Sequence, residues 1–184
     1  MLDALKSVGY RASWEKISEL VRLFQQAHLI GLLPEYSTAL SPKTTTTDKV
    51  YAVDQGMAYA TSRANQQDIG KRLETAIYAE LMRRTANGRM ETVTSYTAPT
   101  QTREKVDFLV GDALASDPYA LYQVTVDMTA EKTRRREVGS LEIAMAKTGI
   151  EDAKIITLRE ATQIETEHGI IEVIPAWKWS LGLK

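Results

Sequence analysis

The feature of this sequence that most restricts its fold is a change of apolar periodicity, from helix to strand and back to helix. Residues 68–84 carry apolar side chains at three- and four-residue spacing, which predicts an amphipathic helix closed by Asn87-Gly88. Three β-branched runs follow and predict an antiparallel meander: 90–96, 105–110 and 120–127. Helical spacing returns over 129–148, before a buried-type strand at 154–158. The order α-β-β-β-α-β predicts a mixed α/β (α+β) core.

The residues before this core have a different character. Residues 14–33 have helical apolar spacing, and 2–10 form a shorter candidate helix. Residues 37–48 contain a run of threonines and no periodic apolar signal, which predicts a linker. We therefore divide the chain into a helical N-terminal segment with its linker, 1–48, and an α/β core domain, 49–184.

The composition excludes several classes of chemistry. With no cysteine and only two histidines, the chain has no disulfide, thiol nucleophile, Cys-ligated metal or HExxH zinc motif. It has no GxxxxGK[ST] phosphate loop, and therefore no ATP site of that type, and no apolar run long enough for a transmembrane helix. Its 23 Lys+Arg and 24 Asp+Glu nearly cancel, which excludes binding driven by overall positive charge. We expect a cytoplasmic protein that does not contact membranes and whose chemistry uses carboxylates, amides and Lys/Arg.

Three polar residues fall on neighbouring elements of the predicted core. Glu74 lies on the helix, Asp107 on the second strand of the meander and Gln123 on the third. Because side chains alternate along strands, residues on adjacent strands can face one side and hold a hard cation such as Mg²⁺. The alternative to a metal site is a structural role for each residue, in which Asp107 pairs with an arginine, Gln123 is a core amide and Glu74 is solvated. We take all three as candidate catalytic residues, and Glu74 and Asp107 as candidate metal ligands.

This combination of order and residue types resembles the PD-(D/E)xK superfamily, which has the restriction-endonuclease-like fold. In that superfamily one strand carries an Asp, the next strand carries (D/E/Q)-x-K, and a Glu often comes from the first helix. The resemblance puts the three candidates in those positions and Thr125 in the position of the lysine. Threonine cannot supply the positive charge that helps to activate water, so the resemblance implies a degraded site. Two lysines are considered as replacements, Lys71 and Lys105.

A closer resemblance extends over roughly residues 14–160. Five blocks, in order, are similar to the uncharacterised domain that follows the P-loop module in many prokaryotic AAA-type ATPases: KVYAVDQG (49–56), GKRLETAIYAELMRR (70–84), EKVDFLV (104–110), LYQVTVDM (121–128) and RRREV (134–138). The resemblance implies a restriction-endonuclease-like core with an N-terminal helical, winged-helix-like appendage. It also implies an ATPase domain before this chain in the intact protein, with which the chain would act.

The sharpest cluster of positive charge lies at the start of the predicted helix 129–148. Lys132, Arg135 and Arg136 are the candidate nucleic-acid-binding residues, because phosphate contacts require lysine or arginine. The alternative is a solvated helix start whose charge is balanced by Glu131 and Glu137.

The function that we favour is a nuclease-fold module of an ATPase, with a degraded site, that binds DNA, a partner protein or its own ATPase domain. One alternative is an active Mg²⁺-dependent DNA endonuclease that uses Glu74, Asp107 and Gln123. Another is a structural assembly domain whose interface is formed by Trp177 and Trp179, on one face of a predicted strand.

Overall fold

The structure is a computed structural model that describes residues 7, 9, 11, 13–37, 48–61, 68–85, 91–112 and 117–183. The first elements are α2 (Trp14–Gln26), β1 (Ile30–Leu33), β2 (Lys49–Ala52), α3 (Gln55–Thr61) and α5 (Ile69–Thr85). They are followed by β3 (Glu91–Thr97), β4 (Lys105–Asp112), β5 (Asp117–Val124) and α6 (Glu131–Thr148). The last are β6 (Ala153–Thr157), β7 (Thr162–Thr166), β8 (Gly169–Pro175) and α7 (Ala176–Ser180). The helix expected at 2–10, most of the expected linker and Asn87-Gly88 lie outside the described residues.

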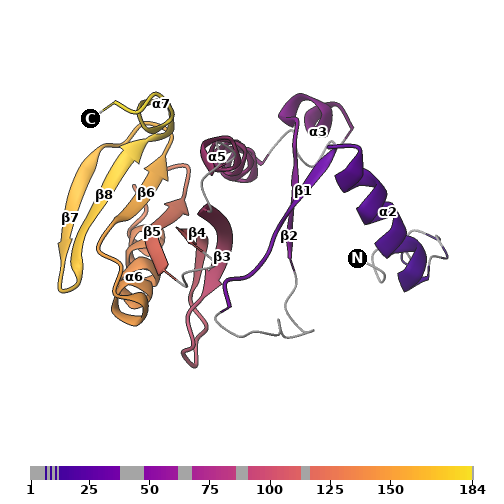
Figure 1. Cartoon of the computed structure of the whole chain (residues 1–184). Helices are drawn as coiled ribbons and strands as arrows, with labels where there is room; N and C mark the ends of the chain where they lie inside the picture. The colour runs from indigo at the N-terminus through magenta and orange to yellow at the C-terminus, as the bar shows by residue number, and fades with distance from the viewer. Residues whose placement is uncertain are drawn as a thin grey trace.

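The larger of the two sheets among the described residues is mixed and has six strands, in the order β3-β4-β5-β6-β8-β7 (Figure 1). Strands β3, β4 and β5 pair antiparallel, which confirms the predicted meander. Strand β6 pairs parallel to β5, and β8 pairs parallel to β6. The antiparallel β7 then forms one edge. The chain is therefore a mixed α/β protein, as the sequence pattern predicts.

Each face of this sheet has its own apolar core. Helix α6 covers one face, where Leu141, Ala144 and Met145 pack against strand residues such as Leu109 and Leu121. Helices α5 and α7 cover the other face together with the two-stranded sheet β1-β2, and this second core includes Ile77, Tyr78, Phe108, Tyr51 and Trp179. Such a layered arrangement buries the apolar side of every helix that flanks the sheet.

The N-terminal part differs from the helix predicted over 14–33. Helix α2 ends at Gln26, His28 adopts a positive φ of 54°, and residues 30–33 form β1. Strand β1 pairs antiparallel with β2, with Leu33 opposite Lys49. The apolar run after residue 28 thus continues as a strand, because a partner distant in sequence supplies its backbone hydrogen bonds. The domain boundary predicted at 48/49 lies between these two paired strands and stays a prediction.

Two further expectations about local structure are corrected. Trp177 and Trp179 lie on the short helix α7 instead of a strand, and their exposed fractions are 58% and 5%. They do not share a face, so the predicted strand with both tryptophans on one side is wrong, while a role as a structural assembly domain stays a prediction. Strand β7 has no counterpart in the sequence-based description. Among the described residues, no helix is both long and apolar enough to cross a membrane.

Candidate functional site

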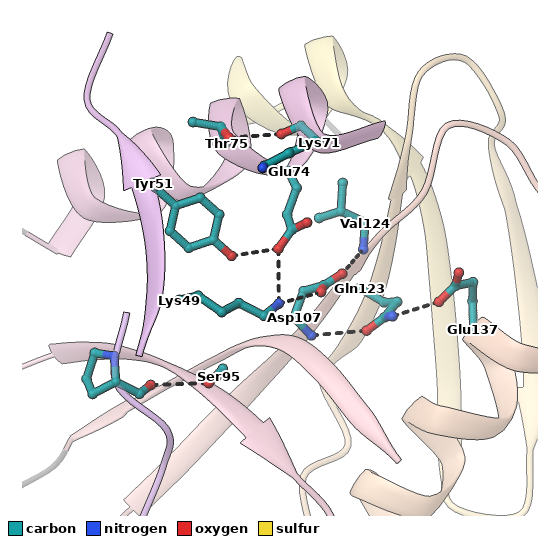
Figure 2. A network of polar contacts seen from close by, with 11 residues as sticks. Lys49, Tyr51, Lys71, Glu74, Thr75, Ser95, Asp107, Gln123, Val124 and Glu137 are labelled. Atoms are coloured by element: carbon teal, nitrogen blue, oxygen red, sulfur yellow. Dashed lines mark hydrogen bonds and ion pairs between the residues drawn. The ribbon is translucent and has the colours of Figure 1, made fainter. Parts of the chain in front are cut away.

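The structure brings Glu74 and Asp107 together around the side chain of Lys49 (Figure 2). Lys49 Nζ lies 3.0 Å from Glu74 Oε1 and 2.9 Å from Asp107 Oδ1. The side chains of Lys49, Glu74 and Asp107 are 35%, 25% and 17% exposed, so the group is partly shielded from water. The two candidate carboxylates thus both contact one cation, which was not predicted, and their catalytic and metal-binding roles stay predictions.

Strand β2 supplies two of the donors that act on Glu74. Lys49 and Tyr51 are two residues apart, so they point to the same side of the strand. The Tyr51 hydroxyl donates to Glu74 Oε1 at 2.6 Å, the same oxygen that Lys49 approaches. The Tyr51 ring stacks on Tyr78 of α5, with 4.3 Å between ring centroids. This stacking fixes the strand against the helix that carries Glu74.

Asp107 lies at an irregularity of strand β4. Tyr96 pairs with Val106 and Thr94 with Leu109, so Ser95 faces two residues of β4, Asp107 and Phe108. An extra residue of this kind is a β-bulge, which bends a strand and redirects a side chain. Asp107 Oδ2 also accepts the Val124 amide at 3.1 Å.

Gln123 is buried on the opposite face of the sheet, where it contacts helix α6. Its Oε1 accepts the backbone amide of Asp107 at 3.1 Å, and its Nε2 donates to Glu137 Oε2 at 2.6 Å. Glu137 is 2% exposed and pairs with Arg136 at the surface. Gln123 thus positions the Asp107 backbone but does not join the carboxylate pair, which agrees with the alternative of a satisfied core amide.

The local electrostatics follow from burial and from these contacts. Burial and the Glu74 carboxylate raise the pKa of Asp107, while Lys49 and the Val124 amide oppose that rise. Burial alone would lower the pKa of Lys49, but Asp107 and Glu74 outweigh it and raise that pKa. Burial, and then Glu74, raise the pKa of the Tyr51 hydroxyl. At neutral pH one ammonium ion therefore faces two carboxyl groups.

The arrangement does not fit a divalent metal ion. Mg²⁺ needs oxygen lone pairs in near-octahedral geometry, often from one or two carboxylates and several waters. Here the inner oxygens of Glu74 and Asp107 both contact the Lys49 ammonium, whose charge would repel a metal ion. Within the described ranges no three His, Cys, Asp or Glu residues form a group that could hold a metal. The residues form a closed ion-pair cluster.

The predicted nucleic-acid-binding residues occupy the first turns of α6. Arg135 pairs with Glu131 at 2.8 Å, and the Arg136 guanidinium contacts Glu137. Lys132 is exposed on the same helix. Both arginines therefore have acidic partners, as the interpretation of a balanced, solvated helix start expects. A role in binding nucleic acid stays a prediction.

Sequence reasoning missed Lys49 as the lysine of the site. Neither Lys71 nor Lys105, the two lysines considered, forms an ion pair with Glu74 or Asp107 among the described residues. The available signal was the block KVYAVDQG, in which Lys49 and Tyr51 share a strand face. The hydroxyl of Thr125, the residue in the expected lysine position, donates to the Asp127 carbonyl.

Comparison with known proteins identifies a similarity to an archaeal protein. No protein-family model matches the chain. The chain is similar to Uncharacterized protein MJ1544 of Methanocaldococcus jannaschii, with 29% identity over 185 residues. The match covers 97% of this chain but 39% of that relative, so the chain spans about two fifths of its length. No solved structure matches.

Proposed function

We propose that this chain is a restriction-endonuclease-like module that does not cleave DNA and acts as a protein-docking domain within a longer, ATPase-containing protein. The order α5-β3-β4-β5-α6-β6, with an antiparallel meander followed by a parallel strand, supports the fold assignment. Helix α2 and the β1-β2 sheet are the elements from which the winged-helix-like appendage would be built.

The observation that carries the loss of cleavage is the position of Lys49. Its ammonium contacts both carboxylates that a nuclease of this fold would use for Mg²⁺. Gln123, the third candidate, faces away from the pair and is held by Glu137. Hydrolysis of a phosphodiester by this superfamily's chemistry depends on a bound metal ion that orients water and stabilises charge on the phosphate. A lysine inside the carboxylate pair leaves no place for that ion.

The surface supports a protein partner over a nucleic acid. Helix α2 buries Ile17 but leaves several large apolar side chains between 44% and 64% exposed: Trp14, Leu20, Leu23 and Phe24. Several large apolar side chains exposed along one helix favour a protein interface. The basic cluster of α6 is balanced by Glu131 and Glu137, and the net charge is -1. The greater length of the archaeal relative supports a partner within the same protein.

The absence of cleavage is tested by plasmid nicking. Wild-type protein at high concentration, with Mg²⁺ or Mn²⁺, should leave supercoiled plasmid intact, and Asp107→Ala should behave in the same way. Cleavage that Asp107→Ala abolishes would overturn this half of the proposal and establish the alternative, an active metal-dependent endonuclease.

The docking role is tested with the part of the archaeal relative that lies outside the match, supplied as a separate chain. The double change Leu23→Ser and Phe24→Ser on α2 should weaken its association with this module at least tenfold. Ile170→Ser, which removes a similarly exposed apolar side chain from β8, is the matched control and should have no effect. Equal behaviour of both variants, or salt-dependent DNA binding that Lys132→Glu with Arg135→Glu removes, would overturn protein docking.

A further inference from the structure

We infer that the Lys49 ammonium replaces a metal ion in this fold: the pair Glu74 and Asp107 serves as an internal latch that fastens strand β2 to the core and keeps divalent cations out. The inference deepens the proposed function, on which it rests for the comparison with a nuclease site.

The geometry of the latch is that of a filled cation site. Nζ lies almost equally far from the two carboxylates, at 3.0 Å from Glu74 and 2.9 Å from Asp107. These lengths are typical of charge-assisted hydrogen bonds. The Tyr51 hydroxyl and the Val124 amide supply a further donor to each carboxylate. The two carboxylates thus accept four hydrogen bonds from protein donors, two from Lys49 and one each from Tyr51 and Val124. These bonds use oxygen lone pairs that a metal ion would require.

The origin of these donors explains why the cluster acts as a latch. Lys49 comes from β2, Glu74 from α5 and Asp107 from β4, so three separate elements meet at one nitrogen atom. In a nuclease site the carboxylates would face a substrate. Here they face a strand of the N-terminal two-stranded sheet, and Figure 2 shows Lys49 and Tyr51 reaching from that strand toward them.

A second connection shows that the N-terminal sheet is closely docked. The chain leaving β1 hydrogen-bonds β3, where the Ser95 amide donates to the Pro34 carbonyl at 2.8 Å and the Tyr36 amide donates to the Ser95 carbonyl at 2.7 Å. Strand β1 also passes so near α5 that a Cβ on Gly31 would lie 2.1 Å from the Tyr78 hydroxyl oxygen. A larger residue at position 31 would have to displace the Tyr78 ring. The N-terminal sheet is therefore attached to the core at two places, by the Lys49 ion pairs on β2 and by the backbone hydrogen bonds between residues 34–36 and Ser95.

Removal of the ammonium should convert the latch into a cation site. Without Lys49, the two carboxylates would face each other with no charge between them. Two carboxylates and several waters are a ligand set that Mg²⁺ and Mn²⁺ accept. Wild-type protein should therefore bind Mn²⁺ weakly or not at all, and a variant without the ammonium should bind it.

The test measures free Mn²⁺ by electron paramagnetic resonance during titration of the full chain. Lys49→Ala should bind one Mn²⁺ at least tenfold more tightly than wild type. The double variant Lys49→Ala with Glu74→Gln should lose that gain. Lys105→Ala, which removes an exposed lysine from β4, is the matched control and should behave as wild type.

Lys49→Gln, which keeps most of the stem and loses the charge, gives the same comparison if Lys49→Ala does not fold. Two results would overturn the inference. One is Mn²⁺ binding by wild type as tight as by Lys49→Ala and sensitive to Glu74→Gln. The other is no gain in binding by either Lys49 variant. DNA cleavage by wild type would instead overturn the proposed function, so the two failures are distinguishable.

Discussion

Replacement of Lys49 by methionine is the most informative perturbation of stability. Methionine keeps an unbranched stem that is one atom shorter and removes the charge that faces Glu74 and Asp107. At about 3 Å and an effective dielectric constant near 20, each attraction amounts to roughly 5–6 kcal/mol in Coulomb energy. Desolvation of the ammonium and its lost rotamer freedom offset most of this energy.

The net effect is bounded by measurements on other ion pairs. Breaking a fully buried pair costs about 3–5 kcal/mol, and breaking an exposed pair costs about 0–1 kcal/mol. The three side chains are 17–35% exposed, which places this cluster between the two cases. We therefore expect Lys49→Met to lower the free energy of unfolding by about 2–3 kcal/mol at neutral pH. For a chain of this size, that corresponds to a fall in Tm of roughly 4–12 °C.

The effect should depend on pH with a defined sign. Burial and Glu74 already raise the pKa of Asp107, and loss of Lys49 raises it further. The folded variant then binds protons more tightly than its unfolded state, so its stability increases as pH falls through the folded-state pKa. The difference from wild type should be largest near pH 7 and should shrink toward about pH 4.

Calorimetry and urea titration at several pH values measure this difference. Lys105→Met is the control, because it removes a lysine that is exposed on β4 and should change stability by less than about 0.5 kcal/mol. A loss for Lys49→Met no larger than that for Lys105→Met, or a loss that does not change with pH, would refute the reasoning.

Three other outcomes follow from the same network. Glu137→Ala leaves Gln123 Nε2 without its buried acceptor and should lower the free energy of unfolding, measured by urea titration, by about 1–3 kcal/mol. Glu137→Gln keeps an acceptor and should lower it clearly less; equal losses in the two variants would contradict the contact between Gln123 and Glu137. Tyr51→Phe removes only the hydroxyl that donates to Glu74 and should lower the free energy of unfolding by about 1 kcal/mol. In an absorbance titration, wild type should show one tyrosine with a pKa above the ordinary value, and the variant should lack it. Asp107 and Glu74 outweigh the effect of burial and raise the pKa of Lys49, so its contribution is retained from neutral pH up to the ordinary lysine pKa of about 10.4 and is lost as pH rises through the higher folded-state value. An advantage of wild type over Lys49→Met that vanishes between about pH 7 and about pH 10 would be inconsistent with this.

Elements with a long apolar period could be predicted from the sequence. The helices near 68–84 and 129–148 and the meander between them were predictable, because local periodicity reports which face of each element is buried. Glu74 and Asp107 could also be placed near each other, because the resemblance to the nuclease superfamily puts them in its helix and strand positions. The helix predicted over 14–33 extends past the end of α2 at Gln26. The reason is that β1 depends on pairing with β2, from which it is separated by a segment without periodic apolar residues.

The position of Lys49 in the site could not be predicted from the local sequence pattern. Lys49 is 25 residues from Glu74 and 58 from Asp107 in sequence, so their meeting depends on how the N-terminal sheet docks. The β-bulge at Asp107 likewise results from the register between β3 and β4, which local composition does not encode. A threonine in the expected lysine position therefore did not mean that the site has no lysine.

The central claim is that an ammonium ion holds the position between Glu74 and Asp107. A crystal of the wild-type protein soaked in millimolar Mn²⁺, with data collected at the manganese absorption edge, tests it most directly. The account predicts no anomalous peak between the two carboxylates and a Lys49 Nζ within hydrogen-bond distance of both. A manganese peak bound by Glu74 and Asp107, with Lys49 turned away, would contradict it.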